Sequence, residues 1–190
     1  MKQQLLLKEK KSSLEFGGSL LKGHRKGKRP VVLSKPLHLV MRSEVATGKL
    51  SLTRFKPFIH ARLQSYALKY HIKVYKLAIN RNHLHLCIQG QDKEEIATFL
   101  KVLAGILAKK ILFHSKVKQT QFWTERVYSR VVQWGRDFRG VLSYIEQNIL
   151  EASGVITYKP RKIVKKNGGA ANRMSPNTLR QPNFEGTYVR

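Results

Sequence analysis

The hydrophobic and polar positions change their period in an orderly way along the middle of the chain. Short apolar or alternating segments, which are typical of β-strands, occur at residues 37–42, 72–79, 82–88 and 122–132. Apolar residues spaced three and four apart, which are typical of amphipathic helices, occur at residues 55–70, 96–107 and 138–149. The predicted order is therefore strand, helix, strand, strand, helix, strand, helix.

This order of elements predicts an α+β domain. Its first six elements match the ferredoxin-like (split βαβ) arrangement, in which helices cover one face of an antiparallel sheet. Asn80 and Arg81 form a short polar connection, so the strands beside them should pair as a hairpin. The added C-terminal helix, at 138–149, either covers the second face of the sheet or leaves that face to a ligand.

Charge is the unusual feature of the composition. The chain has 37 Lys and Arg against 11 Asp and Glu, which gives a net charge of +26. The excess is concentrated at both ends, so we expect a basic flexible N-terminal arm (1–35), a folded domain (36–156) and a basic flexible C-terminal tail (157–190). A surface this positive favours nucleic acid as the partner, with an anionic membrane as the rival.

Two other classes of protein are disfavoured. No apolar stretch approaches the roughly 20 residues of a membrane-spanning helix, and none near the start suits a signal peptide. Cys87 is the only cysteine, so an intrachain disulfide and a disulfide-bonded secreted fold are excluded. We therefore expect a protein of a reducing cytoplasm with no membrane partner.

The sharpest local feature is a pair of histidines, His83 and His85. Side chains alternate between the faces of a strand, so these imidazoles project together while the leucines beside them face the core. Two imidazoles on a rigid strand suit a metal ion, although two surface histidines on a half-exposed strand would give the same pattern. Cys87 continues this face, either as a soft ligand or as a small buried hydrophobe. His38, on the first strand, could face the same side.

The last predicted helix contains a second candidate pair, Tyr144 and Asn148. They are i and i+4 neighbours on one flank of the apolar stripe that is centred near Phe138 and Ile149. A helix docked through this stripe would place both side chains at the edge of the contact. A tyrosine at such a boundary is also a common amphipathic residue.

Together these motifs resemble the single-tyrosine HUH transposases. The pair His83 and His85 lies on a central strand, and Tyr144 follows on a helix 59 positions after the second histidine. The segment 144–148, Tyr-Ile-Glu-Gln-Asn, is similar to the Tyr-Ile-x-x-Asn stretch of the REP-associated tyrosine transposases, and Asn82 also fits that branch. The resemblance covers the whole predicted domain.

The resemblance implies a transposase that cuts and rejoins single-stranded DNA. Tyr144 would form a 5′-phosphotyrosine intermediate, and His83, His85 and Asn148 would hold Mg²⁺ or Mn²⁺. The histidines alone would instead suggest Zn²⁺ or Mn²⁺, because Mg²⁺ usually prefers oxygen ligands. The implied partner is single-stranded or hairpin DNA, and the protein would act as a monomer or homodimer in a bacterial cytoplasm, associated with the nucleoid.

DNA contacts are expected in the N-terminal arm and on the fourth strand. The candidates are basic or aromatic residues suited to phosphates and bases: Arg25, Lys26, Lys28, Arg29, Arg126, Tyr128 and Arg130. A solvated strand face would give the same alternation of arginine and tyrosine.

Two other functions remain open. One is a non-catalytic nucleic-acid-binding module on a ferredoxin-like sheet, similar in idea to an RRM, and the other is an HUH replication initiator or relaxase. The third strand has histidines where an RRM would need stacking aromatics. The chain is short and has no helicase-like region, which favours the transposase.

Overall fold

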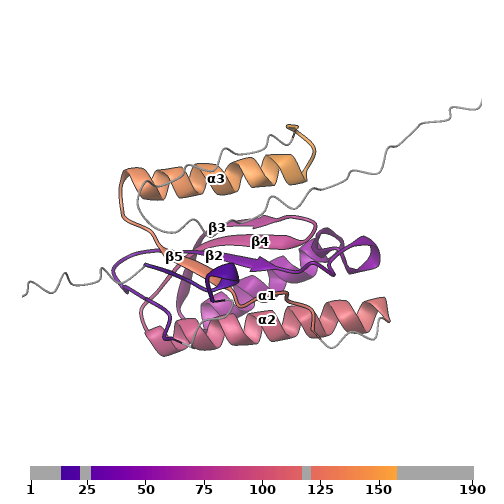
Figure 1. The fold of residues 1–190 in the computed structure, drawn as a ribbon, viewed down its shortest axis with the longest axis horizontal. Coiled ribbons are helices and arrows are strands. Elements are labelled where there is room, and N and C mark those ends of the chain that lie inside the picture. The colour runs from indigo at the N-terminus through magenta and orange to yellow at the C-terminus, as the bar shows by residue number, and fades with distance from the viewer. Residues whose placement is uncertain (1–13, 22–26, 117–120, 158–190) are drawn as a thin grey trace, which may run out of the picture. The chain divides into compact units, whose positions relative to one another are not determined.

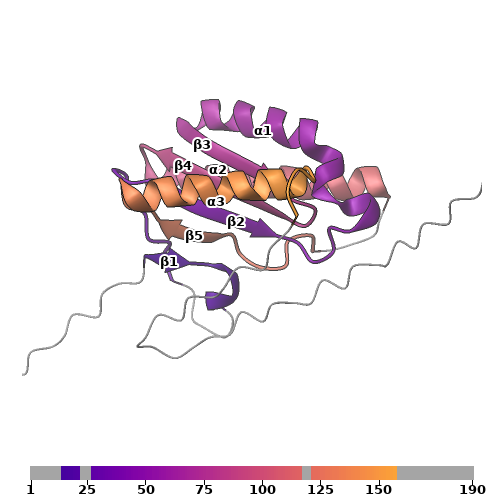
Figure 2. The ribbon, with the colours of Figure 1, turned by 90° about the horizontal axis from the view of Figure 1, so that it is seen from above.

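The structure is a computed structural model, and it describes residues 14–21, 27–116 and 121–157. Its centre is a five-stranded sheet with the order β1-β5-β2-β4-β3, in which neighbouring strands are antiparallel (Figures 1 and 2). The strands are β1 (Glu15–Phe16), β2 (Leu37–Arg42), β3 (Ile72–Ile79), β4 (His83–Gly90) and β5 (Tyr128–Val131).

Helices lie on both faces of this sheet. Figure 1 shows α1 (Lys56–Lys69) and α2 (Lys93–Ser115) on one face and α3 (Arg136–Ala152) on the other. Short 3-10 helices occur at η1 (Gly18–Leu21), η2 (Gly48–Leu50) and η3 (Leu52–Phe55). Among the helices of the described ranges, none has the length and apolar character needed to cross a membrane.

The connection of the strands is that of a ferredoxin-like fold. β4 lies between β2 and β3 and is antiparallel to both, so β2, α1 and β3 form a split βαβ unit. β5 adds to the other side of β2. The predicted α+β, ferredoxin-like sheet with an added C-terminal helix is confirmed, and α3 covers the second sheet face.

Most predicted elements have the expected bounds, but the fourth strand is shorter than predicted. Only Tyr128–Val131 pair as β5, because the chain at residues 124–126 bends away from the sheet. The Thr124 backbone N–H donates to the carbonyl of Arg42, and its hydroxyl accepts from the N–H of Glu44. The alternation of polar and apolar residues there reflects a bend fixed by hydrogen bonds.

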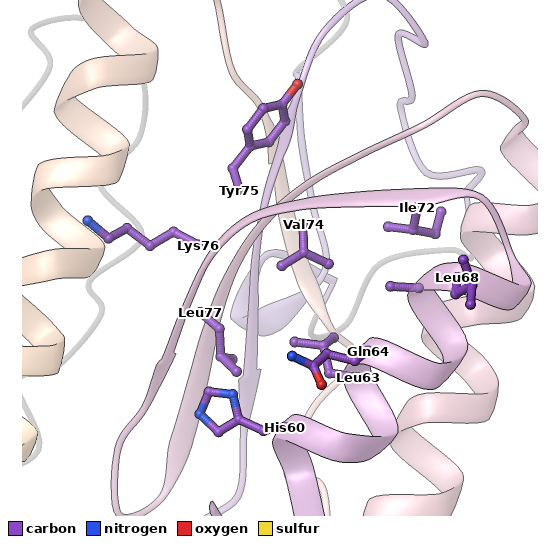
Figure 3. A pocket seen from close by; sticks show the side chains of 10 residues that line it. His60, Leu63, Gln64, Leu68, Ile72, Val74, Tyr75, Lys76 and Leu77 are labelled. Atoms are coloured by element: carbon purple, nitrogen blue, oxygen red, sulfur yellow. The ribbon is translucent and has the colours of Figure 1, made fainter. Parts of the chain in front are cut away.

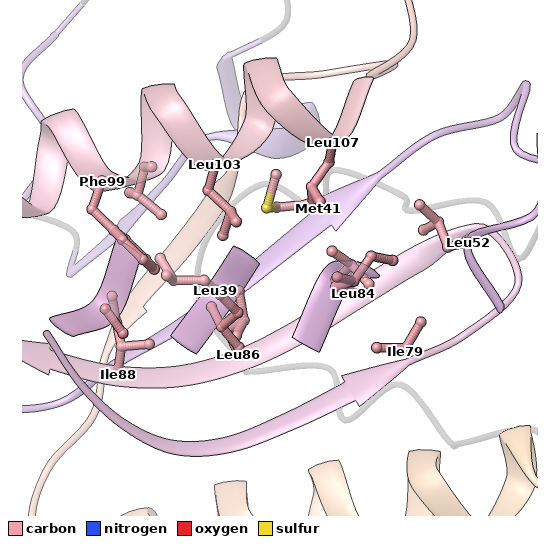
Figure 4. Packing of buried hydrophobic residues seen from close by; sticks show 14 of the residues in the cluster. Leu39, Met41, Leu52, Ile79, Leu84, Leu86, Ile88, Phe99, Leu103 and Leu107 are labelled. Atoms are coloured by element: carbon pink, nitrogen blue, oxygen red, sulfur yellow. The ribbon is translucent and has the colours of Figure 1, made fainter. Parts of the chain in front are cut away.

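The sheet face toward α1 and α2 is the main apolar core. Leu39, Leu86 and Ile88 of the central strands pack against Phe99 and Leu103 of α2 (Figure 4). A buried side chain of this size contributes about 1.5–3 kcal/mol relative to an exposed one. This layer therefore supplies most of the stability and makes β4 a rigid platform.

Part of the expected N-terminal arm packs on the sheet. β1 pairs with β5, and Arg29 Nη2 donates to the carbonyl of Val127 at 2.9 Å while the guanidinium lies over the ring of Phe16. Gly17 has φ 85° and comes so close to Val127 that an added Cβ would lie 2.1 Å from its carbonyl oxygen. These contacts differ from the expectation of a flexible arm over the whole of residues 1–35.

Candidate active site

The sheet face toward α3 is only partly apolar. The buried apolar residues between this face and α3 form one small cluster: Ala78, Cys87, Val132, Val141 and Ile145. Beside it lie His38, His85 and Asn148, with exposed fractions of only 8%, 4% and 2%. Burial of polar groups is unfavourable unless they are hydrogen-bonded, so the partners of these three side chains define the site.

β4 presents His83 and His85 on the same face, with ring centroids 4.8 Å apart. His83 Nδ1 lies 2.8 Å from Asn82 Oδ1, which only accepts, and His83 Nε2 lies 2.6 Å from Asn80 Nδ2, which only donates. A neutral His83 therefore has its proton on Nδ1 and directs the Nε2 lone pair at Asn80.

His38 on β2 holds the other histidine. Its Nε2 lies 3.3 Å from His85 Nδ1, and the two rings stack with centroids 5.5 Å apart. Burial, followed by the charge of Arg130, lowers the pKa of His38 to about 4, so this ring is neutral near pH 7. A neutral His38 can accept the Nδ1 proton of His85, which is how ligand histidines are commonly oriented.

α3 brings Tyr144 and Asn148 to these histidines. The ring of Tyr144 packs edge-on against His85 and His38, with centroids 5.2 and 5.9 Å away. Asn148 Nδ2 donates to the carbonyl of Tyr144 at 2.7 Å, which turns Asn148 Oδ1 toward the sheet. The predicted nucleophile and the three predicted metal-site residues therefore lie together, with Asn148 buried rather than at the edge of the contact.

Asn80 lies at the centre of this group. Its Nδ2 lies 2.6 Å from His83 Nε2 and 3.1 Å from Asn148 Oδ1, and so bridges β4 to α3. The sequence indicates Asn80 only as a turn residue. Its bridging position depends on the closing of the hairpin and on the docking of α3, and the period of the strands shows neither.

The donor atoms suit a cation. Two acceptor atoms, His83 Nε2 and Asn148 Oδ1, point at the same N–H-bearing atom of Asn80, so the gap between them is complementary to positive charge. Within the described ranges no group of three or more His, Cys, Asp or Glu side chains could hold a metal ion, so the set consists of imidazoles and amides. Such a mixed set fits a divalent ion.

Cys87 is not among these donors. Its side chain is fully buried in the apolar cluster beneath α3, and burial raises the pKa of its thiol to about 12. Metal ligation needs the thiolate. The structure therefore favours the reading of Cys87 as a small buried hydrophobe.

A cavity of about 490 Å³ opens beside Tyr144. Its lining comes from β2, β5 and α3: His38, Arg130, Arg136, Asp137, Gly140, Val141 and Tyr144. Arg130 donates to both carboxylate oxygens of Asp137, each at 3.0 Å, which ties β5 to the first turn of α3. The cavity thus joins the tyrosine to two arginines.

A groove of about 500 Å³ lies on another part of the molecule, between α1 and the edge strand β3 (Figure 3). Its lining is mostly apolar, with His60 and Gln64 on the α1 side. Lys76 also lines it but pairs with Glu146 of α3. The groove contains no pair of histidines, so the chemistry-bearing residues of the described chain gather beside Tyr144.

The predicted DNA contacts have different surroundings. Lys28 and Arg126 are exposed, whereas Arg29, Tyr128 and Arg130 are half-buried. Burial, followed by Arg126, lowers the pKa of Arg29 to about 10; burial, followed by the charge of Glu15, raises the pKa of Tyr128 to about 12. Tyr128 is thus packed against the N-terminal segment instead of presenting an open face to a base.

Two predicted contacts, Arg25 and Lys26, lie outside the described residues. Among the described ones, only Lys28 and Arg126 present exposed cationic side chains. Alternation would place Arg126, Tyr128 and Arg130 on one strand face. In the structure Arg126 lies in the exposed bend, whereas Tyr128 and Arg130 belong to the packed strand β5.

A ferredoxin-like sheet with a histidine pair on a central strand and a tyrosine helix across it defines the class of protein. A model of the family described as IS200-like transposases matches residues 32–148. The chain belongs to this family, whose members are enzymes that cut and join DNA. The family expected from the histidine pair and the tyrosine helix is confirmed.

A solved structure of a transposase shows the same fold. A REP-associated tyrosine transposase bound to a REP hairpin matches 67% of this chain and 73% of its own, with 12% identity and a TM-score of 0.51. A protein from Deinococcus radiodurans R1, assigned as a transposase, matches 65% and 97% with 19% identity and a TM-score of 0.39. No curated protein matches the chain.

Proposed function

We propose that this transposase cuts and rejoins single-stranded DNA with Tyr144 as the nucleophile. The observation that carries the proposal is the packing of Tyr144 against His85, on a helix whose next turn brings Asn148 to Asn80, which also contacts His83. Four side chains from separate parts of the sequence share one site beneath α3. Family membership supports the same reading.

Tyr144 attacks the phosphorus of the scissile phosphodiester. A bond forms between its phenolic oxygen and phosphorus, and the bond from phosphorus to the 3′-oxygen breaks. The products are a 5′-phosphotyrosine and a 3′-hydroxyl, which takes up one proton as the tyrosine loses one. Since the number of phosphoester bonds is unchanged, a 3′-hydroxyl can reverse the step without a nucleotide cofactor.

His83, His85 and Asn148 would hold Mg²⁺ or Mn²⁺ through their Nε2 and Oδ1 atoms. The bound ion would polarise the scissile phosphate and offset the charge that develops on it. Asn82 accepts the Nδ1 proton of His83, and His38 accepts that of His85. Both contacts keep the ligand nitrogens deprotonated and oriented.

The proposed substrate is a single strand or a hairpin, as in the related REP-associated transposase, which is bound to a REP hairpin. Lys28 and Arg126, with Arg25 and Lys26, would neutralise phosphates. Arg130 lines the cavity beside Tyr144, where it can meet the phosphate of a bound strand. Arg29 and Tyr128 would lie beside the bound strand. The protein would act as a monomer or homodimer associated with the bacterial nucleoid.

The test uses end-labelled hairpin DNAs from the flanks of the gene, with Mn²⁺ or Mg²⁺, and a denaturing gel. We expect a protein–DNA adduct that survives SDS, that EDTA prevents, and that Tyr144→Phe abolishes. Tyr66→Phe, which removes a hydroxyl from α1 on the other sheet face, is the matched control and should keep the adduct. Tight DNA binding without any adduct would favour a non-catalytic binding module instead.

A further inference from the structure

We propose that Asn80 is a fourth side-chain ligand of the cation, and that its amide makes a half-turn when the ion binds. The inference rests on the proposed metal site. It concerns a residue that belongs to neither the histidine pair nor the tyrosine helix. Three observations carry it: the position of the Asn80 side chain, its buried oxygen, and the hydrogen bonds that ion binding would break.

The position of Asn80 is fixed by the hairpin. Its backbone N–H donates to the carbonyl of His83 at 2.9 Å, which closes the turn between β3 and β4. From there its side chain reaches two proposed ligand atoms at once, His83 Nε2 at 2.6 Å and Asn148 Oδ1 at 3.1 Å. The end of this amide therefore lies at the point where those ligands converge.

The other end of the amide is the second observation. Asn80 Oδ1 is buried and has no hydrogen-bond partner in the part of the chain that the structure describes. A buried carbonyl oxygen normally has a partner, so this one is an exception that needs a reason. A cation would supply one, because amide oxygens are good ligands for Mg²⁺ and Mn²⁺.

A half-turn about χ2 exchanges Nδ2 and Oδ1. Without an ion, three lone pairs would then face one another, so the orientation with Nδ2 inward is preferred. With an ion, the bond to Oδ1 reverses the preference, because it outweighs the burial of Nδ2 in the position where Oδ1 has no partner. The two hydrogen bonds of Nδ2 are lost in any case, since His83 and Asn148 become ligands, and Oδ1 has no bond to lose within the described structure.

This assignment changes the character of the donor set. Two imidazole nitrogens and one amide oxygen favour Zn²⁺ or Mn²⁺, whereas a second amide oxygen moves the set toward ions that prefer oxygen. Asn80 would thus raise the affinity for Mn²⁺ and Mg²⁺ more than that for Zn²⁺, whose usual protein ligands are imidazole, thiolate and carboxylate rather than an amide oxygen.

The test measures ion binding rather than DNA cleavage. Free Mn²⁺ is followed by electron paramagnetic resonance during titration of the full chain, and Zn²⁺ binding by the Mn²⁺ that it displaces. Asn80→Ala should weaken Mn²⁺ binding by more than about a hundredfold, which is the upper end of what loss of an outer-shell partner costs, and Zn²⁺ binding by less. Asn80→Asp should strengthen Mn²⁺ binding. Gln64→Ala, which removes an exposed amide from α1, is the matched control and should change neither.

Each other outcome counts against the assignment. Unchanged Mn²⁺ affinity in Asn80→Ala overturns it, and tighter binding would mean that the amide only competes with the ion. If Asn80→Ala does not fold, Asn80→Asp decides, and an affinity no higher than that of the natural chain overturns the proposal. If the natural chain forms the Mn²⁺-dependent adduct, the proposed function stands whichever of these results overturns the role of Asn80. No Mn²⁺ binding by the natural chain overturns both.

Discussion

The sheet face toward α1 and α2 is built almost entirely from apolar side chains, whereas the face toward α3 buries two histidines and an asparagine beside a few apolar residues. β4 contributes to both, because Leu84 and Leu86 point one way and His83 and His85 the other. A register slip of one residue would exchange them. The apolar face therefore fixes the geometry of the polar one.

The largest effect is expected on the α3 face. His83→Ala should lower the yield of the tyrosine–DNA adduct more than about a hundredfold, beyond the usual loss from an outer-shell change. Its free energy of unfolding should change by only about 1 kcal/mol, because the side chain is half-buried and outside the apolar clusters. The adduct is measured on a denaturing gel and the stability by urea unfolding. A full adduct yield would remove His83 from the site.

The opposite behaviour is expected on the α1 and α2 face. Phe99 is fully buried in the main core, and Phe99→Ala should lower the free energy of unfolding by about 3–5 kcal/mol. Urea unfolding followed by circular dichroism measures this loss. Adduct yield per folded molecule should stay close to that of the natural chain. A loss of adduct comparable to that of His83→Ala would show that the two faces are not separable.

The smallest effect is expected at the contact between β5 and α3, where Arg130 pairs with Asp137. Hydrogen bonds from Arg130, followed by that from the backbone of Gln133, hold the pKa of Asp137 below its ordinary 3.8 despite partial burial. A lowered carboxyl pKa stabilises the fold above the ordinary pKa, and this contribution is lost as pH falls below it. Asp137→Asn should lower the free energy of unfolding at pH 7 by up to about 1 kcal/mol.

The variant should also have a flatter loss of stability below pH 3.8, which urea unfolding at a series of pH values measures. Asp92→Ala is a useful comparison, because Asp92 caps α2 on the other face of the sheet. Identical pH profiles for Asp137→Asn and the natural chain would mean that the ion pair does not contribute to the docking of α3.

The parts of this structure that follow from local period were predictable. β2 and β3 have the predicted bounds, and the stripe of α3 docks as its spacing indicates. The shared face of His83 and His85 follows from strand alternation alone. What the sequence does not show is register between strands, and His38 meets His85 only because β2 and β4 pair with Val40 opposite His85.

Two other features depend on tertiary contacts that leave no periodic signal. Asn148 is buried because α3 docks deeply, and its amide then finds Asn80 across the interface. β1 is only two residues long and lies in a strongly basic segment, so neither length nor composition indicates a strand. Its pairing with β5 needs the close approach at Gly17.

The amide and imidazole donors beneath α3 have a consequence for how ion and DNA would bind together. None of these proposed ligand side chains has a formal charge when the imidazoles are neutral. Arg130 and Arg136 line the cavity nearby. The neutral ligands would leave the charge of a bound divalent ion uncompensated until a phosphate binds beside it. The ion would therefore raise the affinity for DNA, and DNA would raise the affinity for the ion. Such coupling is reciprocal, so the factor by which DNA tightens the ion equals the factor by which the ion tightens DNA. The ion would then act as a cooperative partner of the strand rather than as a permanent part of the protein.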